Sequence, residues 1–228
     1  MDTIQIKPIA YIHNDFTAKF GIPRQSGLVE QVLSKIVFTP EFRNADALRG
    51  LEGYSHLWLI WQFSEAVRQG WSPTVRPPRL GGNTRMGVFA TRSPFRPNNL
   101  GLSCVTLLGV EQTQTNGTVL QVGGADLMDG TPIFDIKPYI PYSDAKTDAV
   151  GGFTDSVDSF LLEVDFPDRL LLLLPASKRQ AAIEVLSHDP RPSYQRTKGR
   201  IYGLAFAGFD IRFTVDEGKL FVQEVCKL

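Results

Sequence analysis

The feature that most constrains the fold of this chain is a succession of short apolar stretches in its first two thirds. The stretches are rich in β-branched and aromatic residues, many alternate with polar residues, and Gly, Pro or Asn separates them. These properties are typical of β-strands. Strands this short and this regularly spaced favour a β-barrel or sandwich over a parallel, doubly wound sheet. The stretches are TIQIKPIAYI, SKIVFT, HLWLIWQF, GVFATR, SCVTLLGVEQ, TVLQVGG and IFDIKPYI.

Composition excludes several classes of protein. Hydrophobic residues make up 43% of the 228 residues, which is enough for a sizeable core. No window approaches the roughly 18 apolar residues of a membrane span, and the N-terminus does not resemble a secretory signal. We therefore expect a cytoplasmic protein with no membrane partner. Motifs of dinucleotide-binding proteins, P-loop proteins, serine hydrolases and zinc proteases are absent from the sequence.

The character of the sequence changes after residue 145. Segment 146–160 is polar, acidic and contains glycine, which is typical of a linker. Beyond it, PASKRQAAIEVLSHD predicts a helix, and RIYGLAFAGFDIRFTVDEGKLFVQEV predicts a hairpin. We therefore predict a mainly β, barrel-like N-terminal domain at 1–145, a linker at 146–160 and a small α+β C-terminal domain at 161–228.

The net charge of zero hides a segregation of charge. Between Glu65 and Glu111 the chain has no acidic residue, while the interval holds six arginines and no lysine. One explanation is a solvated rim whose acidic partners come from elsewhere in the fold. The other is a surface for an anionic ligand, because a planar guanidinium suits bidentate contact with phosphate and stacking on bases. Arg76, Arg79 and Arg85 lie in a long segment in which apolar residues do not recur at the spacing of a helix or a strand. Loops of this length are often functional, so we predict that these arginines contact nucleic acid.

A second group of charged residues lies in GADLMDGTPIFDIKPYIPYSD. Asp126 and Asp129 surround a turn, and the strand that follows carries Asp135 and Lys137 on one face. A plain structural turn is one explanation. Otherwise the carboxylates could bind a ribose, a cationic centre or a metal. A metal is the weakest of these because no His or Cys accompanies them, so no metal is predicted.

Four stretches, taken together, resemble the TsaA-like family. They are PRQSGLV, ADALRGLEGYSHLWLIW, PTVRPPRLGGNTRMGVFATRSPFRPNNLGLS and DLMDGTPIFDIKPYIPY. Characterised bacterial members are tRNA methyltransferases, which use S-adenosylmethionine to methylate the N6 nitrogen of threonylcarbamoyladenosine at position 37, next to the anticodon. The resemblance implies a β-barrel-like cofactor domain unlike the Rossmann methyltransferases. It also implies a homodimer with the cofactor pocket near the subunit boundary, and the anticodon stem-loop of a threonine tRNA as substrate.

The resemblance also implies a set of cofactor contacts, in which Arg92 binds the cofactor carboxylate. The set is Pro23, Arg24, Gln25, His56, Leu57, Arg92, Leu102, Asp126, Leu127, Met128, Asp129, Gly130 and Thr131. For RNA, the arginines and a lysine are expected to bind phosphate, and tyrosines to stack on bases. The predicted RNA contacts are Arg76, Arg79, Arg85, Arg96, Lys137, Tyr139 and Tyr194.

For catalysis, the methyl donor is already activated, so alignment of the reacting atoms is expected to contribute most of the rate. The ureido-like substrate nitrogen must lose one proton, and a carboxylate is a reasonable acceptor. Asp129 is the first candidate and Asp135 the second, although either could instead hold the ribose or face the sulfonium charge. A functional alternative of another class stays open, namely a non-catalytic RNA-binding or cofactor-sensing β-barrel.

Overall fold

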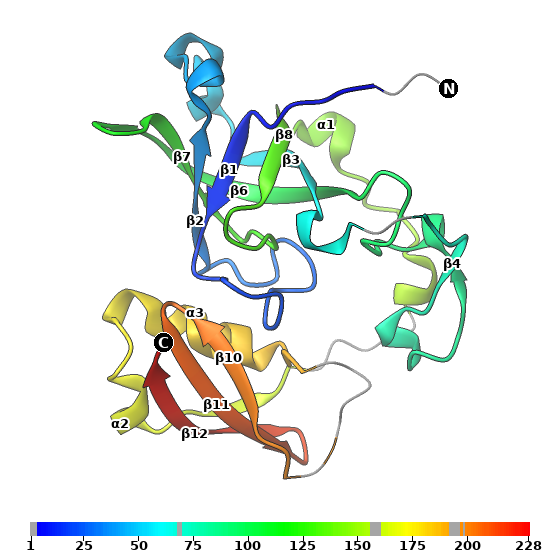
Figure 1. Ribbon diagram of the computed structural model, residues 1–228, viewed down its shortest axis with the longest axis vertical. Coiled ribbons are helices and arrows are strands. Elements are labelled where there is room, and N and C mark those ends of the chain that lie inside the picture. Colours follow the sequence, from blue (N-terminus) through cyan, green and yellow to red (C-terminus); the bar gives the residue numbers. More distant parts are fainter. Residues whose placement is uncertain (1–3, 68–69, 156–160, 192–196, 198) are drawn as a thin grey trace.

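The computed structural model describes residues 4–67, 70–155, 161–191, 197 and 199–228. Six strands of the N-terminal part pair in a ring in the order β1-β2-β7-β6-β3-β8. Figure 1 labels these strands in the upper part of the molecule. The ring closes through a short β1–β8 pairing of two residue pairs, Ala10 with Ile133 and Tyr11 with Pro132. The strands are β1 (Ala10–His13), β2 (Leu33–Phe38), β3 (His56–Gln62), β6 (Leu100–Thr113), β7 (Gly117–Gly123) and β8 (Pro132–Pro138).

Alternation along these strands builds the core inside the ring. In β3, for example, Leu57, Leu59 and Trp61 are buried, while the residues between them are partly exposed. They belong to one core with inward residues of other strands of the ring, such as Ile36 of β2 and Leu120 of β7. Removing these apolar side chains from water is the main favourable term for the ring.

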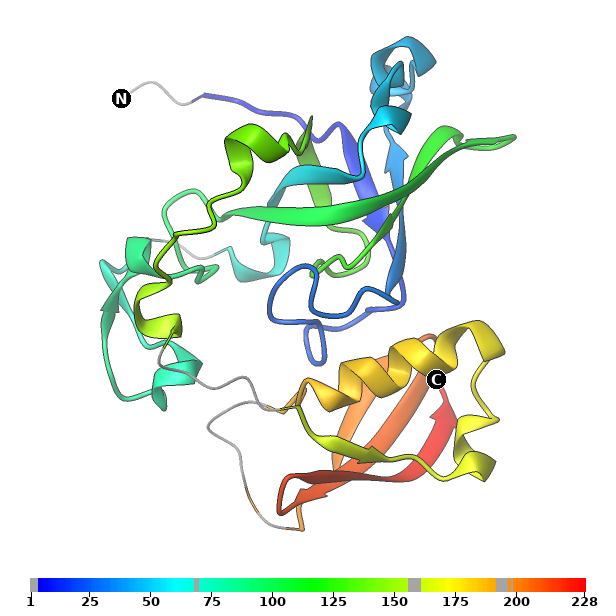
Figure 2. The same cartoon turned by 180° about the vertical axis from the view of Figure 1, so that it is seen from behind.

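A separate four-stranded sheet, ordered β10-β11-β12-β9, forms the C-terminal part. Helix α3 (Ala176–Ser187) covers one face of it (Figures 1 and 2). Its other elements are β9 (Glu163–Asp165), α2 (Asp168–Leu171), β10 (Tyr202–Phe206), β11 (Phe209–Asp216) and β12 (Lys219–Lys227). The predictions of a mainly β chain, a barrel-like N-terminal domain and a small α+β C-terminal region are confirmed.

The segment between β1 and β2, residues 14–32, belongs to the second core and is called the pocket loop below. Phe16, Val29 and Val32 are at most 1% exposed and pack with the apolar residues of the C-terminal sheet and α3. The rings of Phe16 and Phe206 lie 5.4 Å apart. The pocket loop therefore joins the barrel to the C-terminal sheet.

A second long segment, residues 70–91, protrudes between β3 and β6 and is called the arm. It contains the short strands β4 (Thr74–Val75) and β5 (Met86–Gly87), which pair with each other alone. In Figure 2 the arm lies to one side of the barrel. The 3-10 helices inside it are η5 (Pro78–Leu80) and η6 (Val88–Ala90).

One predicted strand is wrong. Of GVFATR only Gly87 lies in a strand, and Val88–Ala90 form η6 instead. The carbonyl of Val88 accepts from the backbone N–H of Thr91 at 3.2 Å and from its hydroxyl at 2.8 Å, which closes a turn. The remaining helices are α1 (Pro141–Asp144), η1 (Pro40–Phe42), η2 (Ala45–Leu48), η3 (Leu51–Gly53), η4 (Ser64–Ala66) and η7 (Gly152–Thr154). Within the described ranges, no helix has the length and apolar composition needed to cross a membrane.

Candidate functional site

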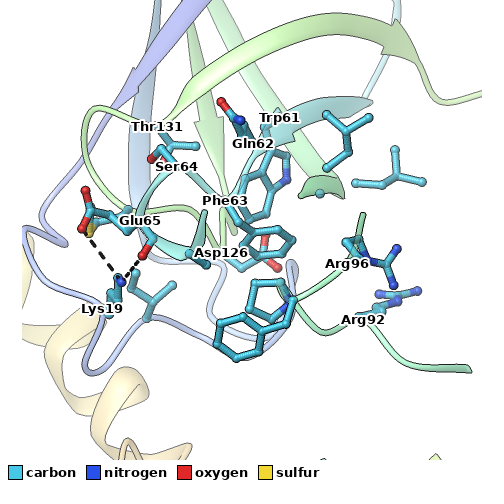
Figure 3. A pocket seen from close by; sticks show the side chains of 18 of the residues that line it. Lys19, Trp61, Gln62, Phe63, Ser64, Glu65, Arg92, Arg96, Asp126 and Thr131 are labelled. Carbon is cyan, nitrogen blue, oxygen red and sulfur yellow. Dashed lines mark hydrogen bonds and ion pairs between the residues drawn. The ribbon is translucent and has the colours of Figure 1, made fainter. Parts of the chain in front are cut away.

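A cavity of about 660 Å³ lies where the pocket loop meets β3 and β6. Its volume is within the usual range of small-molecule sites. Figure 3 shows Arg92 and Arg96 at one end of it and the pair formed by Lys19 and Glu65 at the other. The walls come from five stretches of the sequence: residues 19–25, 58–67, 92–96, 100–102 and 126–131.

The structure brings together eight of the thirteen predicted cofactor contacts. Those that line the cavity are Pro23, Arg24, Gln25, Arg92, Leu102, Asp126, Met128 and Thr131. The other five are not among its lining residues. Leu57 and Leu127 are fully buried in the barrel core, and Gly130 is exposed in the turn. His56 begins β3 with an exposed side chain, and Asp129 is described below. The cofactor contacts predicted for these five stay predictions.

Asp126 is the most deeply set acidic group of the cavity. Its carboxylate accepts a hydrogen bond from the hydroxyl of Ser103 at 2.5 Å, and that hydroxyl accepts one from the indole of Trp61 at 2.9 Å. Burial raises the pKa of Asp126, and the Ser103 hydrogen bond, its own backbone N–H, the Arg92 charge and the N–H of Ser26 offset part of this rise. The carboxyl group is therefore more readily protonated than an ordinary aspartate.

Trp61 can reach Ser103 because the strand beside it leaves room. The two residues lie on paired strands, where Trp61 faces Gly101. A Cβ atom added to Gly101 would meet the indole at 2.3 Å, so any larger residue would displace the ring. The glycine thus permits the close approach of ring and backbone that positions Asp126 through Ser103.

The arginines around the cavity donate hydrogen bonds to carbonyl and amide oxygens. Arg24 donates to the carbonyls of Asp189 at 3.1 Å and Arg191 at 3.4 Å, which belong to the C-terminal part. The guanidinium of Arg92 donates to the side-chain oxygen of Gln25. Arg96, predicted to bind RNA phosphate, donates to the carbonyls of Ser93, Thr91 and Val88 at 3.0, 2.6 and 3.4 Å. Arg96 therefore stabilises the loop that carries Arg92.

The two predicted proton acceptors do not line the cavity. Asp129 accepts from the backbone N–H of Asn14 at 3.1 Å and lies 3.3 Å from the Nδ1 atom of His13. Asp135 lies 3.0 Å from the ammonium of Lys137 on β8. Their catalytic role stays a prediction.

The predicted RNA contacts lie in different parts of the molecule. Arg76 and Arg85 are exposed on the arm, and Arg85 makes one long hydrogen bond of 3.5 Å to the hydroxyl of Thr74. Lys137 is exposed, and the ring of Tyr139 packs 5.8 Å from that of Trp58. Tyr194 and the side chain of Arg79 lie outside the described residues.

Sequence reasoning missed the aromatic lining and one ion pair. Trp58, Trp61, Phe63 and Phe95 line the cavity, and the rings of Trp61 and Phe63 lie 4.2 Å apart. At the far end Lys19 forms an ion pair with the carboxylate of Glu65 at 3.9 Å and donates to the backbone carbonyl of Glu65 at 2.5 Å. The tryptophans of HLWLIWQF were a signal, but only the register with β6 shows which wall they form. Among the described residues, no group of three or more His, Cys, Asp or Glu could hold a metal ion.

Comparisons with known proteins agree with this architecture. The model of the tRNA-methyltransferase O N-terminal domain matches residues 11–145, and that of the TrmO C-terminal domain matches residues 161–228. The tRNA (adenine(37)-N6)-methyltransferase of Escherichia coli is 40% identical over 225 residues, which cover 95% of each chain. A Pseudomonas aeruginosa protein described as the putative S-adenosylmethionine-dependent methyltransferase RcsF is 40% identical over 218 residues, 92% of each chain.

Solved structures give the same result. The crystal structure of TrmO from Pseudomonas aeruginosa superposes with a TM-score of 0.77 at 33% identity, and the match covers 99% of this chain and 100% of that one. The resemblance found in the sequence motifs is thus confirmed. Because the family models match both parts of the molecule, the chain belongs to the tRNA-methyltransferase O (TrmO) family.

Proposed function

We propose that this protein is an S-adenosylmethionine-dependent methyltransferase that modifies the N6 nitrogen of the adenine at position 37 of tRNA. The observation that carries the proposal is the convergence of five stretches, from residue 19 to residue 131, on one cavity of a TrmO-family fold. The finer substrate, threonylcarbamoyladenosine in a threonine tRNA, is part of the same proposal.

The residues of the cavity fit this cofactor chemically. S-adenosylmethionine supplies an activated methyl group when bound, and it carries a carboxylate, two cationic groups and an adenine ring. Arg92 offers a guanidinium for the carboxylate, and Asp126 and Glu65 offer negative charge for the cationic groups. Trp58 and Phe95 offer aromatic faces for a purine. Gln25 holds the Arg92 guanidinium, so little reorganisation would be needed on binding.

Three carboxylates compete for the role of proton acceptor. Asp129 and Asp135 are the candidates from the sequence, but they face His13 and Lys137 away from the lining. Asp126 is the stronger candidate because it lines the cavity and its pKa is raised, and a base acts best when its pKa approaches the working pH. We propose that Asp126 accepts the proton from the substrate nitrogen.

The test combines binding and chemistry. Calorimetry should show saturable binding of S-adenosylmethionine, and mass spectrometry of tRNA nucleosides should show the added methyl group. Asp126→Asn should lower the single-turnover rate by about 100- to 10,000-fold, while Asp129→Asn and Asp135→Asn serve as matched controls. A large loss in Asp129→Asn alone would return the role to the sequence candidate.

Other results would favour the alternative class. A protein that binds tRNA without saturable S-adenosylmethionine binding would be a non-catalytic RNA-binding barrel. A protein that binds the cofactor but transfers no methyl group to tRNA would be a cofactor sensor. Either result would reject the proposed methyltransferase.

We further propose a cytoplasmic homodimer built from domains at 1–145 and 161–228 joined by a linker at 146–160. Support for self-association comes from the outer face of the barrel near the cavity, where the apolar side chain of Leu102 is 57% exposed. Sedimentation should then give a species of about twice the 25.4 kDa chain mass. An active monomer at micromolar concentration would contradict a pocket shared between subunits.

A further inference from the structure

The arm carries two large aromatic side chains that the barrel core does not use. Trp71 is 55% exposed and Phe89 is 76% exposed. Their ring centroids lie 6.1 Å apart with an angle of 33° between the planes. The two residues flank the β4–β5 ribbon, because the N–H of Val88 bonds to the carbonyl of Pro73 at 2.9 Å directly beside them. A pair of exposed aromatic rings held by a short ribbon is typical of an interaction surface.

The other end of the same ribbon carries two cations. Val75 pairs with Met86, so the next residues outward, Arg76 and Arg85, are neighbours. Both are exposed, and no carboxylate of the described residues forms an ion pair with either. The sequence also has no Asp or Glu from residue 66 to residue 110. Aromatic faces and unpaired guanidinium groups thus lie on one small projection.

We propose that the arm is a binding surface for single-stranded RNA. In it Trp71 and Phe89 stack on unpaired bases, and Arg76 and Arg85 bind neighbouring phosphates. Each base has an apolar face that stacks on an aromatic ring, and the planar guanidinium group matches the geometry of a phosphate for bidentate contact. The positive charge and the missing acids favour RNA over a protein partner as the occupant.

The position of the arm deepens the proposed function, on which this inference rests. Val67, just before the arm, and Arg92, just after it, both line the cavity. Nucleotides stacked on the arm would therefore be close to a base that enters the cavity. The arm would bind the unpaired nucleotides of the substrate loop, while the cavity binds the methyl donor and the target base.

The test uses the full-length protein and the isolated anticodon stem-loop RNA as probe, with a double-stranded RNA of equal length as reference. The double variant Trp71→Ala/Phe89→Ala should bind the stem-loop about tenfold to a hundredfold more weakly. The slope of log affinity against log salt should stay unchanged because no phosphate contact is lost. Affinity for the duplex should not change. Trp71→Phe should keep most of the stem-loop affinity that Trp71→Ala loses. Tyr54→Ala, which removes an exposed ring elsewhere, should bind the stem-loop as wild type does.

Several outcomes would overturn the proposal. Unchanged stem-loop affinity in the double variant would show that the rings do not stack on bases. Equal losses for stem-loop and duplex would show that the arm does not distinguish unpaired nucleotides. If the double variant instead changes a dimer into a monomer in sedimentation, the rings belong to an interface between copies of this chain. Retained S-adenosylmethionine binding shows that the variant is folded.

The proposed function can fail separately. If wild-type protein transfers no methyl group yet the double variant loses stem-loop affinity, the arm binds RNA and the proposed methyltransferase activity is rejected. If wild type methylates tRNA and the double variant has an unchanged KM for tRNA, the proposed RNA-binding role of the arm is rejected and the methyltransferase activity is kept.

Discussion

The pocket loop and the arm are made from similar residues but are anchored in opposite ways. Both are long segments with glycine, proline and arginine and without regular strands of the barrel. The pocket loop buries Phe16 in the C-terminal core and is fastened to β6 by the bond from the N–H of Cys104 to the hydroxyl of Ser26. Among the described strands, the two in the arm pair only with each other, and Trp71 of the arm is exposed. A fixed wall suits a small cofactor, whereas a projection that presents its side chains to solvent suits a large partner.

The C-terminal part is the reason for this difference. Lys178 of α3 bonds to the carboxylate of Asp15 at 2.5 Å, and the N–H of Ala207 bonds to the carbonyl of Asp15 at 3.3 Å. Arg24 reaches carbonyls of the same part. The small sheet therefore holds the loop that carries three predicted cofactor contacts, although it does not itself line the cavity among the described residues. We expect damage to this contact to reach the cofactor site.

The largest expected effect comes from a pair of glycines that both have a positive φ. Gly21 in the pocket loop has φ +91°, and an added Cβ would lie 2.0 Å from a methyl carbon of Leu204. Gly21→Val should destabilise the protein by about 2–5 kcal/mol, because overpacking adds to the strain of a positive φ. In the arm, Gly81 has φ +72° with nothing within 4 Å. Gly81→Val should therefore cost only about 1–2 kcal/mol.

Urea denaturation of both variants measures this difference, and calorimetry measures cofactor binding. Gly21→Val should also weaken S-adenosylmethionine binding, whereas Gly81→Val should not. Equal losses of stability in the two variants would mean that the pocket loop is no better anchored than the arm.

The next effect concerns arginines of the two regions. Arg92 lines the cavity and bonds to Gln25 of the pocket loop. Arg92→Ala should weaken S-adenosylmethionine binding by about 1.5–3 kcal/mol, which is the usual range for hydrogen bonds to a charged group. Arg85→Ala, on the arm, should leave this affinity as it is. If calorimetry gives equal affinities for wild type and Arg92→Ala, then Arg92 does not bind the cofactor.

The sequence predicted these two regions unequally, for physical reasons. Alternation identified most strands because the two faces of a strand meet different surroundings. It could not show that Trp61 lies against Gly101, since that contact depends on register between strands. Asp126 and Asp129 look equivalent in DLMDGT, yet Ser103 binds one inside the cavity and Asn14 binds the other outside it. Hydrogen bonds from distant segments decided which of them faces the site.

A smaller effect tests the electrostatics of the fixed wall. The pKa of Asp126 is raised in the folded state, chiefly by burial. Its contribution to stability is therefore fully present below the ordinary pKa of an aspartate and is lost as pH rises through the raised value. Urea titrations from acid to neutral pH should show this loss in wild type but not in Asp126→Asn. The same decline in both proteins would contradict the assignment.

A half-buried aspartate provides a control of opposite sign. The pKa of Asp144 is lowered by hydrogen bonds from the N–H of Ile140 and the indole of Trp58. Its contribution is present above the ordinary pKa and is lost as pH falls through the lowered one. In wild type, part of the free energy of unfolding should therefore be lost at acid pH, and this part should be missing in Asp144→Asn. Asp126→Asn should keep the same loss at acid pH as wild type.

The smallest effect is expected in the arm and decides what its arginines do. Because Arg85 makes one long hydrogen bond and is exposed, Arg85→Gln should change the free energy of unfolding by no more than about 0.5 kcal/mol. If its guanidinium binds a phosphate, the slope of log tRNA affinity against log salt should become less steep by about 0.7–0.9. Arg212→Gln is the matched control, because that arginine pairs with Asp210 and Glu224 on the C-terminal sheet. If the slope is unchanged in Arg85→Gln, or becomes less steep to the same extent in Arg212→Gln, the arginines of the arm do not bind phosphate and are only solvated surface residues.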